Sequence, residues 1–271
     1  MPESREFFLS KLYILESLPE LELKTGRRLL DDLIHYNYEI NKEYIATNNS
    51  ASFFEAFQHI KAEVKVASHY PIIHLEMHGS TGGLSLASGQ FVGWKELYEI
   101  LKDINILVRN NLVLTLAVCR GAFLSEIIKP TAPSPFLGLI APIDEVISAD
   151  LLQGFTAFYQ ELFTSADVDV ALTKLRTYHL DGYRLIDVSL LYDQVYDHYR
   201  QFHLSPNAVE DRINNIVNRL RSAGAVPMRM SEAEARKRAK RSIVLRDQDN
   251  YKRLRDRFLM IDIYPENKKR F

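Results

Sequence analysis

Apolar residues recur along this chain with two alternating spacings. Short continuous runs such as residues 72–77 (IIHLEM) and 112–118 (LVLTLAV) are typical of buried strands, and residues 94–109 between them have the length and spacing of a helix. Further strands are expected at residues 11–18, 36–46, 135–146 and 183–188, and further helices at 25–34, 52–67, 148–163 and 168–175. This alternation predicts an α/β fold with a mostly parallel central sheet.

Turn and capping residues separate these elements. Pro19 ends the first strand, and Thr25 and Ser52 are expected to cap the two helices that follow. Residues 83–94 (GLSLASGQFVGW) alternate around a Ser-Gly pair, which predicts a β-hairpin. The preceding STGG lacks the Lys and Ser or Thr of a phosphate-binding loop, so we expect neither a nucleotide nor any other cofactor.

Two reactive side chains follow the two strands of the predicted β-α-β unit. His78 comes directly after the run at 72–77, and Cys119 directly after the run at 112–118. Loops that leave the carboxyl ends of parallel strands lie on the same edge of a sheet, so His78 and Cys119 are expected to emerge side by side. A free cysteine is often an inert core residue, but a position at a strand end followed by Arg-Gly favours a reactive thiol.

A thiol and an imidazole at one sheet edge indicate acyl transfer. The thiolate is the nucleophile, and a neighbouring histidine takes its proton or stabilises the anion. Gly79 has no β-carbon and allows the backbone to approach a reacting carbonyl closely. Its N–H and that of Cys119 are candidates for an oxyanion hole.

These motifs resemble those of the caspase-like cysteine peptidases, and among them the bacterial CHAT-type members most closely. The histidine strand reads H-x-x-x-H-G from His74 to Gly79, and residues 117–121 (AVCRG) are similar to the QACRG-type signature of caspases. The resemblance extends over roughly residues 11–177. It implies Cys119 as nucleophile and His78 as general acid/base, in a three-layer αβα sandwich. It also implies a protein substrate, a protein activator, and a role as a regulated effector in bacterial (anti-phage) defence.

Candidate substrate contacts follow from the same resemblance. In caspase-like proteins the segment after the histidine borders the cleft, which makes Ser80, Thr81 and Gly82 candidates. Ala117 stands where metacaspase-type enzymes have an Asp and caspases a Gln, and its small apolar side chain favours an uncharged residue before the scissile bond. Asp144 and Glu145 could restore a preference for a basic residue, or they could be solvated loop carboxylates.

Two further polar residues precede the candidate dyad. His74, Glu76 and His78 fall on one face of a strand because side chains alternate with period two. His74 is expected to be a packed, hydrogen-bonded residue, and its alternative, functional reading is support for His78 from behind. Glu76 is expected either to orient an imidazole in the same way or to have a structural partner. No H-E-x-x-H motif or cysteine pair is present, so no metal site is expected.

Composition narrows the class of protein. A chain of 271 residues with 46% apolar residues can bury a sizeable core. One cysteine excludes an internal disulfide, and the polar start MPESREFF lacks the features of a secretory signal. No apolar run approaches the ~20 residues needed to cross a bilayer. We therefore expect a cytoplasmic protein with no membrane partner.

The chain is expected to divide into a peptidase domain at residues 1–204 and a helical, basic extension at 205–271 that packs on it. Residues 236–257 contain ten Lys or Arg and three Asp, although the net charge of the chain is −1. The basic run is read first as a charged helix face, so nucleic acid is not expected as a partner. Two alternatives to the peptidase stay open, namely a catalytically silent interaction module and a nucleic-acid-binding regulator that uses the basic run.

Overall fold

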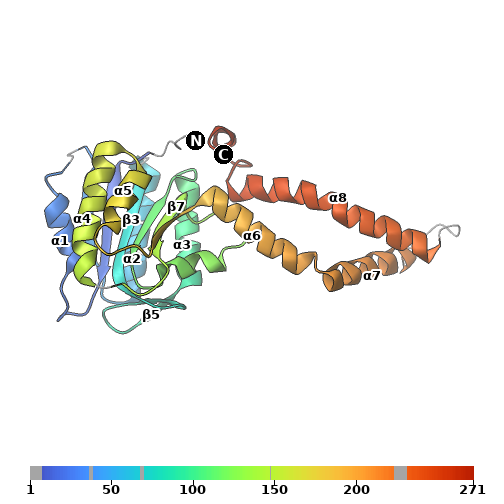
Figure 1. Ribbon diagram of the computed structural model, residues 1–271, viewed down its shortest axis with the longest axis horizontal. Helices are drawn as coiled ribbons and strands as arrows, with labels where there is room; N and C mark the ends of the chain where they lie inside the picture. The colour runs from blue at the N-terminus through green and yellow to red at the C-terminus, as the bar shows by residue number, and fades with distance from the viewer. Residues whose placement is uncertain (1–7, 37–38, 68–69, 147, 223–230) are drawn as a thin grey trace.

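The computed structural model describes residues 8–36, 39–67, 70–146, 148–222 and 231–271. Its central sheet has the strand order β2-β1-β3-β6-β7-β8, in which only the pairing of β7 with β8 is antiparallel. Figure 1 shows helices on both faces of this sheet, so the predicted three-layer αβα arrangement is confirmed. The strands are β1 (Lys11–Ser17), β2 (Asn41–Ala46), β3 (Pro71–Gly79), β6 (Val113–Ala117), β7 (Gly138–Pro142) and β8 (Tyr183–Asp187).

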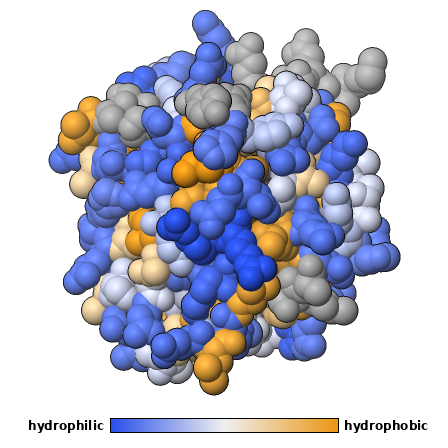
Figure 2. Space-filling model, turned by 90° about the vertical axis from the view of Figure 1, so that its left-hand side faces the viewer, coloured by the Kyte–Doolittle hydropathy of each residue, from blue (hydrophilic) through white to orange (hydrophobic). Residues whose placement is uncertain are grey.

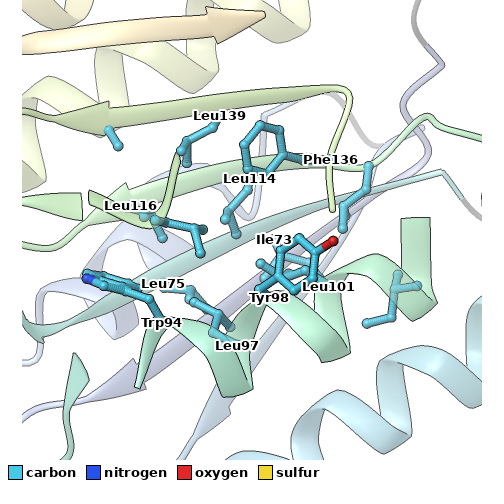
Figure 3. Packing of buried hydrophobic residues seen from close by; sticks show 14 of the residues in the cluster. Ile73, Leu75, Trp94, Leu97, Tyr98, Leu101, Leu114, Leu116, Phe136 and Leu139 are labelled. Carbon is cyan, nitrogen blue, oxygen red and sulfur yellow. The ribbon is translucent and has the colours of Figure 1, made fainter. Parts of the chain in front are cut away.

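The two faces of the sheet bury different side chains of the same strands. Ile73 and Leu75 of β3 point into one core, and Ile72 points into the other, as the period of two requires. The first core is covered by α2 (Ser50–Ala67) and α3 (Trp94–Leu107), and Figure 3 shows α3 packed against β3, β6 and β7. The second core is covered by α1 (Thr25–Leu33), α4 (Ser148–Ser165) and α5 (Val168–Arg176).

The caps or first residues of α1, α2 and β2 differ from the sequence predictions. Thr25 is the first helical residue of α1 and not its cap, because a carboxylate oxygen of Glu16 in β1 accepts the N–H of Gly26 at 2.7 Å. Helix α2 begins at Ser50, where Asn49 accepts the N–H of Ser52 and the Ser52 hydroxyl accepts the N–H of Asn49. Strand β2 begins at residue 41 and not at 36, because the turn that ends α1 continues through Tyr36.

The predicted hairpin is present between β3 and α3. Strand β4 (Gly83–Ser85) pairs with the end of β3 and with β5 (Phe91–Gly93), both in antiparallel fashion. A short 3-10 helix, η1 (Gly121–Ile127), follows β6 and leads towards β7. The hairpin and η1 therefore both begin at the edge of the sheet where β3 and β6 end.

Three helices extend away from the sheet as an arm. Helices α6 (Val188–His203) and α7 (Pro206–Ser222) lead outward, and α8 (Glu232–Phe258) returns, as Figure 1 shows. The Ser-Pro pair at 205–206 is a helix-start signal in the sequence, and Ser205 caps α7, while Ser231 caps α8. Pro227 predicts a linker between α7 and α8, and this position lies outside the described residues. Because α6 belongs to the arm together with α7 and α8, the arm begins before residue 205.

The arm is fastened at both ends by apolar contacts. At its outer end a small core joins α7 and α8 through Ile213, Val217 and Ile243. At its base, Tyr192 and Tyr196 of α6 pack on Tyr251 of α8. The Tyr192 hydroxyl donates to the carbonyl oxygen of Tyr251 at 2.6 Å. Beyond α8, Leu259 is buried in the first core, and η2 (Pro265–Lys269) follows.

The end of the molecule opposite the arm is mostly polar. Figure 2 shows hydrophilic side chains over most of this face, with apolar side chains in small groups between them. Among the described residues, no helix combines the length and the apolar character that a membrane crossing requires.

Candidate active site

The pairing of β3 with β6 brings the two candidate catalytic residues together. The last paired residues are Glu76 of β3 and Ala117 of β6. Two residues further along each segment come His78 and Cys119. Both of these side chains line one pocket of about 240 Å³ at the carboxyl edge of the sheet. The parallel β-α-β arrangement thus places the imidazole and the thiol at one concave site.

Gly79 brings the backbone of β3 against the peptide that carries the thiol. A β-carbon added at residue 79 would lie 2.2 Å from Cγ1 of Val118 and 2.5 Å from the carbonyl oxygen of Cys119. Both separations are shorter than van der Waals contact, so no other residue fits here without movement of the chain. The glycine is required for this close approach.

A tight turn follows the cysteine and redirects the chain away from the pocket. Arg120 adopts a left-handed backbone conformation with φ 58°, its N–H donates to the carbonyl oxygen of Asp144, and Gly121 donates to Val118. The thiol itself is partly buried and unpaired with any other sulfur. The backbone of Val146 holds the thiol from both sides: its N–H donates to Sγ at 3.5 Å, and the thiol donates to its carbonyl oxygen at 3.8 Å.

A carboxylate that the sequence analysis did not select holds the histidine. Nε2 of His78 lies 2.9 Å from Oε2 and 3.0 Å from Oε1 of Glu22, in the segment between β1 and α1. This segment leaves the same edge of the sheet as the ends of β3 and β6, because β1 is parallel to β3 and adjacent to it. A search for carboxylates after every parallel strand would have included Glu22.

The deeper part of the pocket is acidic. Glu76 lines it, and Ala117, its partner in register, lies beside it on β6. Behind Glu76 lies the buried Glu16, whose two oxygens accept the N–H of Gly26 at 2.7 Å and the hydroxyl of Tyr44 at 2.6 Å. Burial raises the pKa of Glu16 above its usual value, and the nearby charge of Glu76 adds to that rise, while the two hydrogen bonds oppose it.

His74 lies in the core behind the site and has its own hydrogen-bond partners. Nδ1 lies 2.9 Å from the hydroxyl of Thr115 and 3.1 Å from that of Tyr159, and Nε2 lies 3.4 Å from Oε2 of Glu76. The imidazole is fully buried and packs edge-on against Phe155. It is a packed, hydrogen-bonded residue that helps to position Glu76.

The remaining candidate substrate contacts lie apart from this pocket, except for Ala117. Ser80 is engaged within the hairpin, where its hydroxyl donates to the carbonyl oxygen of Gly83. Glu145 is exposed and forms an ion pair with Arg120 at 3.1 Å, and the carbonyl oxygen of Asp144 accepts the N–H of Arg120. The residues that line the pocket include none of Ser80, Asp144 and Glu145.

Among the described residues, one cluster of side chains that could bind a metal ion lies outside the pocket of Cys119. Atoms of Glu43, His59 and Glu63 approach within 4.8 Å of one another near the other end of β1 and β2. The ammonium group of Lys11 already lies 2.7 Å from Glu43 and 2.6 Å from Glu63, and the hydroxyl of Tyr13 donates to Glu63. This cluster is accounted for as an ion-pair network around Lys11.

No protein-family model matches this chain, and no curated protein sequence is significantly similar to it. The resemblance to caspase-like peptidases therefore rests on the sequence motifs around His78 and Cys119.

Proposed function

We propose that this protein is a cysteine endopeptidase that cleaves a protein substrate through Cys119 and His78. The observation that carries the proposal is the shared pocket at the ends of adjacent parallel strands, lined by both side chains. Gly79, packed against the Cys119 peptide, and Glu22, bound to the imidazole, add support, because each is a feature that such a reaction uses.

The proposed reaction has two stages. Nε2 of His78 is engaged by Glu22, which leaves Nδ1 to take the proton from the Cys119 thiol. The thiolate attacks the carbonyl carbon of the scissile bond, and the N–H groups of Gly79 and Cys119 stabilise the oxyanion. The C–N bond then breaks as His78 donates its proton to the leaving amine, and water hydrolyses the thioester through the same histidine.

The biological proposal rests on the resemblance to CHAT-type peptidases. Such proteins commonly act as effectors in bacterial defence, switched on by another protein, and we extend that role to this chain. The single cysteine fits a reducing compartment, so we place the proposed activity in the cytoplasm.

The charge of the arm gives little support to the alternative of nucleic-acid binding. Arg236 of α8 pairs with Glu210 of α7, Arg238 pairs with Glu234 in its own helix, and Asp247 pairs with Arg200 of α6. Two of these pairs join α8 to neighbouring helices and the third lies within α8, as expected of a structural face. Binding that depends on the arm would weaken steeply with salt, and a flat salt response would exclude it.

The deciding experiment is cleavage of a diverse peptide library by the purified protein, with cut positions read by mass spectrometry. We expect cuts with the wild type and none with Cys119→Ala or His78→Ala, while His35→Ala, a change at an exposed histidine outside the pocket, retains activity. Circular dichroism and thermal unfolding establish that the inactive variants are folded. If the wild type cuts no peptide and its Cys119 thiol does not react with a peptidyl alkylating probe, the catalytically silent interaction module is the better assignment.

A further inference from the structure

The pocket beside Cys119 is acidic, and no lysine or arginine is among the described residues that line it. Two carboxylates, Glu22 and Glu76, line this pocket, and its other polar members are Thr25, His78 and Cys119. Glu22 is bound to His78 near the rim, which leaves Glu76 as the charged group of the deeper part.

One carboxylate oxygen of Glu76 has no hydrogen-bond partner among the described residues. Glu76 is only 3% exposed, and its Oε2 atom lies 3.4 Å from Nε2 of His74. No described residue donates a hydrogen bond to Oε1, whereas both oxygens of the neighbouring Glu16 are engaged, by Gly26 and by Tyr44. Oε1 is not fully enclosed, so a cationic ligand in the pocket can reach it and complete the hydrogen bonds of the carboxylate.

A second negative group strengthens this preference. A β-carbon built on Gly26 would lie 3.1 Å from Oε2 of Glu76 and 3.2 Å from Oε1 of Glu16, so the two carboxylates converge on one point of α1. The nearby Lys24 donates to the carbonyl oxygens of Leu18 and Pro19, and it borders the adjacent pocket on the far side of Leu18. It is not among the residues that line the pocket of Cys119.

The separation between Cys119 and Glu76 matches the length of a long basic side chain. Glu76 of β3 is paired with Ala117 of β6. Ala117 comes two residues before Cys119 in the sequence. Two residues of an extended strand span roughly 6.6 Å, which is about the reach of an extended lysine or arginine side chain. The side chain of Ala117 is only a methyl group, so it leaves room beside Glu76 for the side chain of a ligand.

We propose that the pocket binds a lysine or arginine at P1, the residue whose carbonyl Cys119 attacks, and that Glu76 is the carboxylate that recognises it. This inference rests on the proposed peptidase function and names its substrate class. It replaces the expectation that Asp144 and Glu145 would supply a basic preference, because those residues lie outside the pocket. It also replaces the expectation that Ala117 favours an uncharged residue, since the small side chain exposes a carboxylate beside it.

The test uses peptidyl acyloxymethyl ketones that differ only at P1, in which the thiolate forms a thioether and displaces a carboxylate. Lysine is compared with norleucine, which has a similar length and no charge, and labelling of Cys119 is followed by intact mass. We expect the wild type to react faster with the lysine probe by about tenfold to hundredfold, since a charge-assisted hydrogen bond contributes about 1.5–3 kcal/mol. Glu76→Gln should bring the ratio of the lysine rate to the norleucine rate close to one, while Glu145→Gln, the control, should keep the wild-type ratio.

The outcomes separate the two proposals. Labelling by norleucine as fast as by lysine, or a lysine preference that persists in Glu76→Gln, would overturn the specificity and leave the peptidase intact. If neither probe labels Cys119 in any variant, the peptidase assignment loses its support. In that case binding of n-butylguanidinium, measured by ligand-observed NMR, decides the pocket's preference without turnover. Binding to wild type and Glu145→Gln but not to Glu76→Gln supports a basic ligand, and absence of binding to the wild type overturns it.

Discussion

Nε2 of His78 lies 2.9 Å from Oε2 of Glu22, although the two residues lie on different connections of the sheet. The contact joins the end of β3 to the segment that follows β1, so three neighbouring strands contribute to the site. Both side chains are about half exposed, which means that charge attraction alone contributes little to stability. In the proposed reaction, the contact fixes the orientation of the imidazole and keeps Nδ1 available to the thiol.

Replacement of Glu22 by Gln should reduce turnover and leave substrate binding nearly unchanged. The amide keeps the shape of the side chain but does not stabilise the imidazolium that forms when Cys119 loses its proton, so we expect kcat to fall about tenfold or more at constant KM. Glu20→Gln, at an exposed carboxylate in the same segment, is the control. An unchanged kcat in Glu22→Gln would mean that the pair is a surface ion pair without a role in positioning.

Gly79→Ala should damage the site more than the fold. The added methyl group would meet Val118 and the carbonyl oxygen of Cys119, so the ends of β3 and β6 must move apart. We expect a loss of about 1–3 kcal/mol in the free energy of unfolding, as for other overpacked positions, together with loss of nearly all cleavage activity. Urea unfolding and peptide cleavage measure the two effects.

Gly182→Ala is the matched control for this substitution, because a β-carbon there meets no atom within 4 Å. It should retain both stability and activity. Full activity in Gly79→Ala would show that the close approach of the two strand ends is not needed for the reaction.

The sequence predicts the layers and the meeting of His78 with Cys119 because both follow from local pattern. Runs such as residues 112–118 are apolar enough to be read as buried strands, and a parallel β-α-β unit has one common handedness. The partners of these residues are harder to predict. Glu16 caps α1 from strand β1, and Glu22 reaches His78 from the loop after β1. Neither contact can be predicted from the residues next to it in the sequence. The antiparallel direction of β8 is likewise set by its packing against β7.

The outer end of the arm should unfold independently of the body. Ile243 is buried between α7 and α8 with Ile213 and Val217, in a core separate from those of the sheet. Ile243→Asp would bury an unpaired carboxylate at a cost of several kcal/mol, which exceeds what so small a core provides. We expect faster amide hydrogen exchange in α7 and in the outer half of α8, with β1, β3 and β6 unchanged. Lys240→Asp, at an exposed position, is the control, and loss of protection throughout the sheet would contradict the prediction.

The buried Glu16 should make the protein less stable as pH rises. Its pKa is raised in the folded state from about 4.5, so the folded protein holds this proton more tightly than the unfolded chain does. The resulting stabilisation is fully present below pH 4.5 and is lost as pH rises through the folded-state pKa. Glu16→Gln does not titrate, and its amide can still accept from Gly26 while it donates to Tyr44. We therefore expect the variant to gain stability relative to the wild type as pH rises from 4.5 to neutrality, by up to about 1.4 kcal/mol for each unit by which the pKa is raised. Urea unfolding of both proteins across this range measures the difference, and a wild type that gains on the variant with rising pH would show that the hydrogen bonds from Gly26 and Tyr44 outweigh burial.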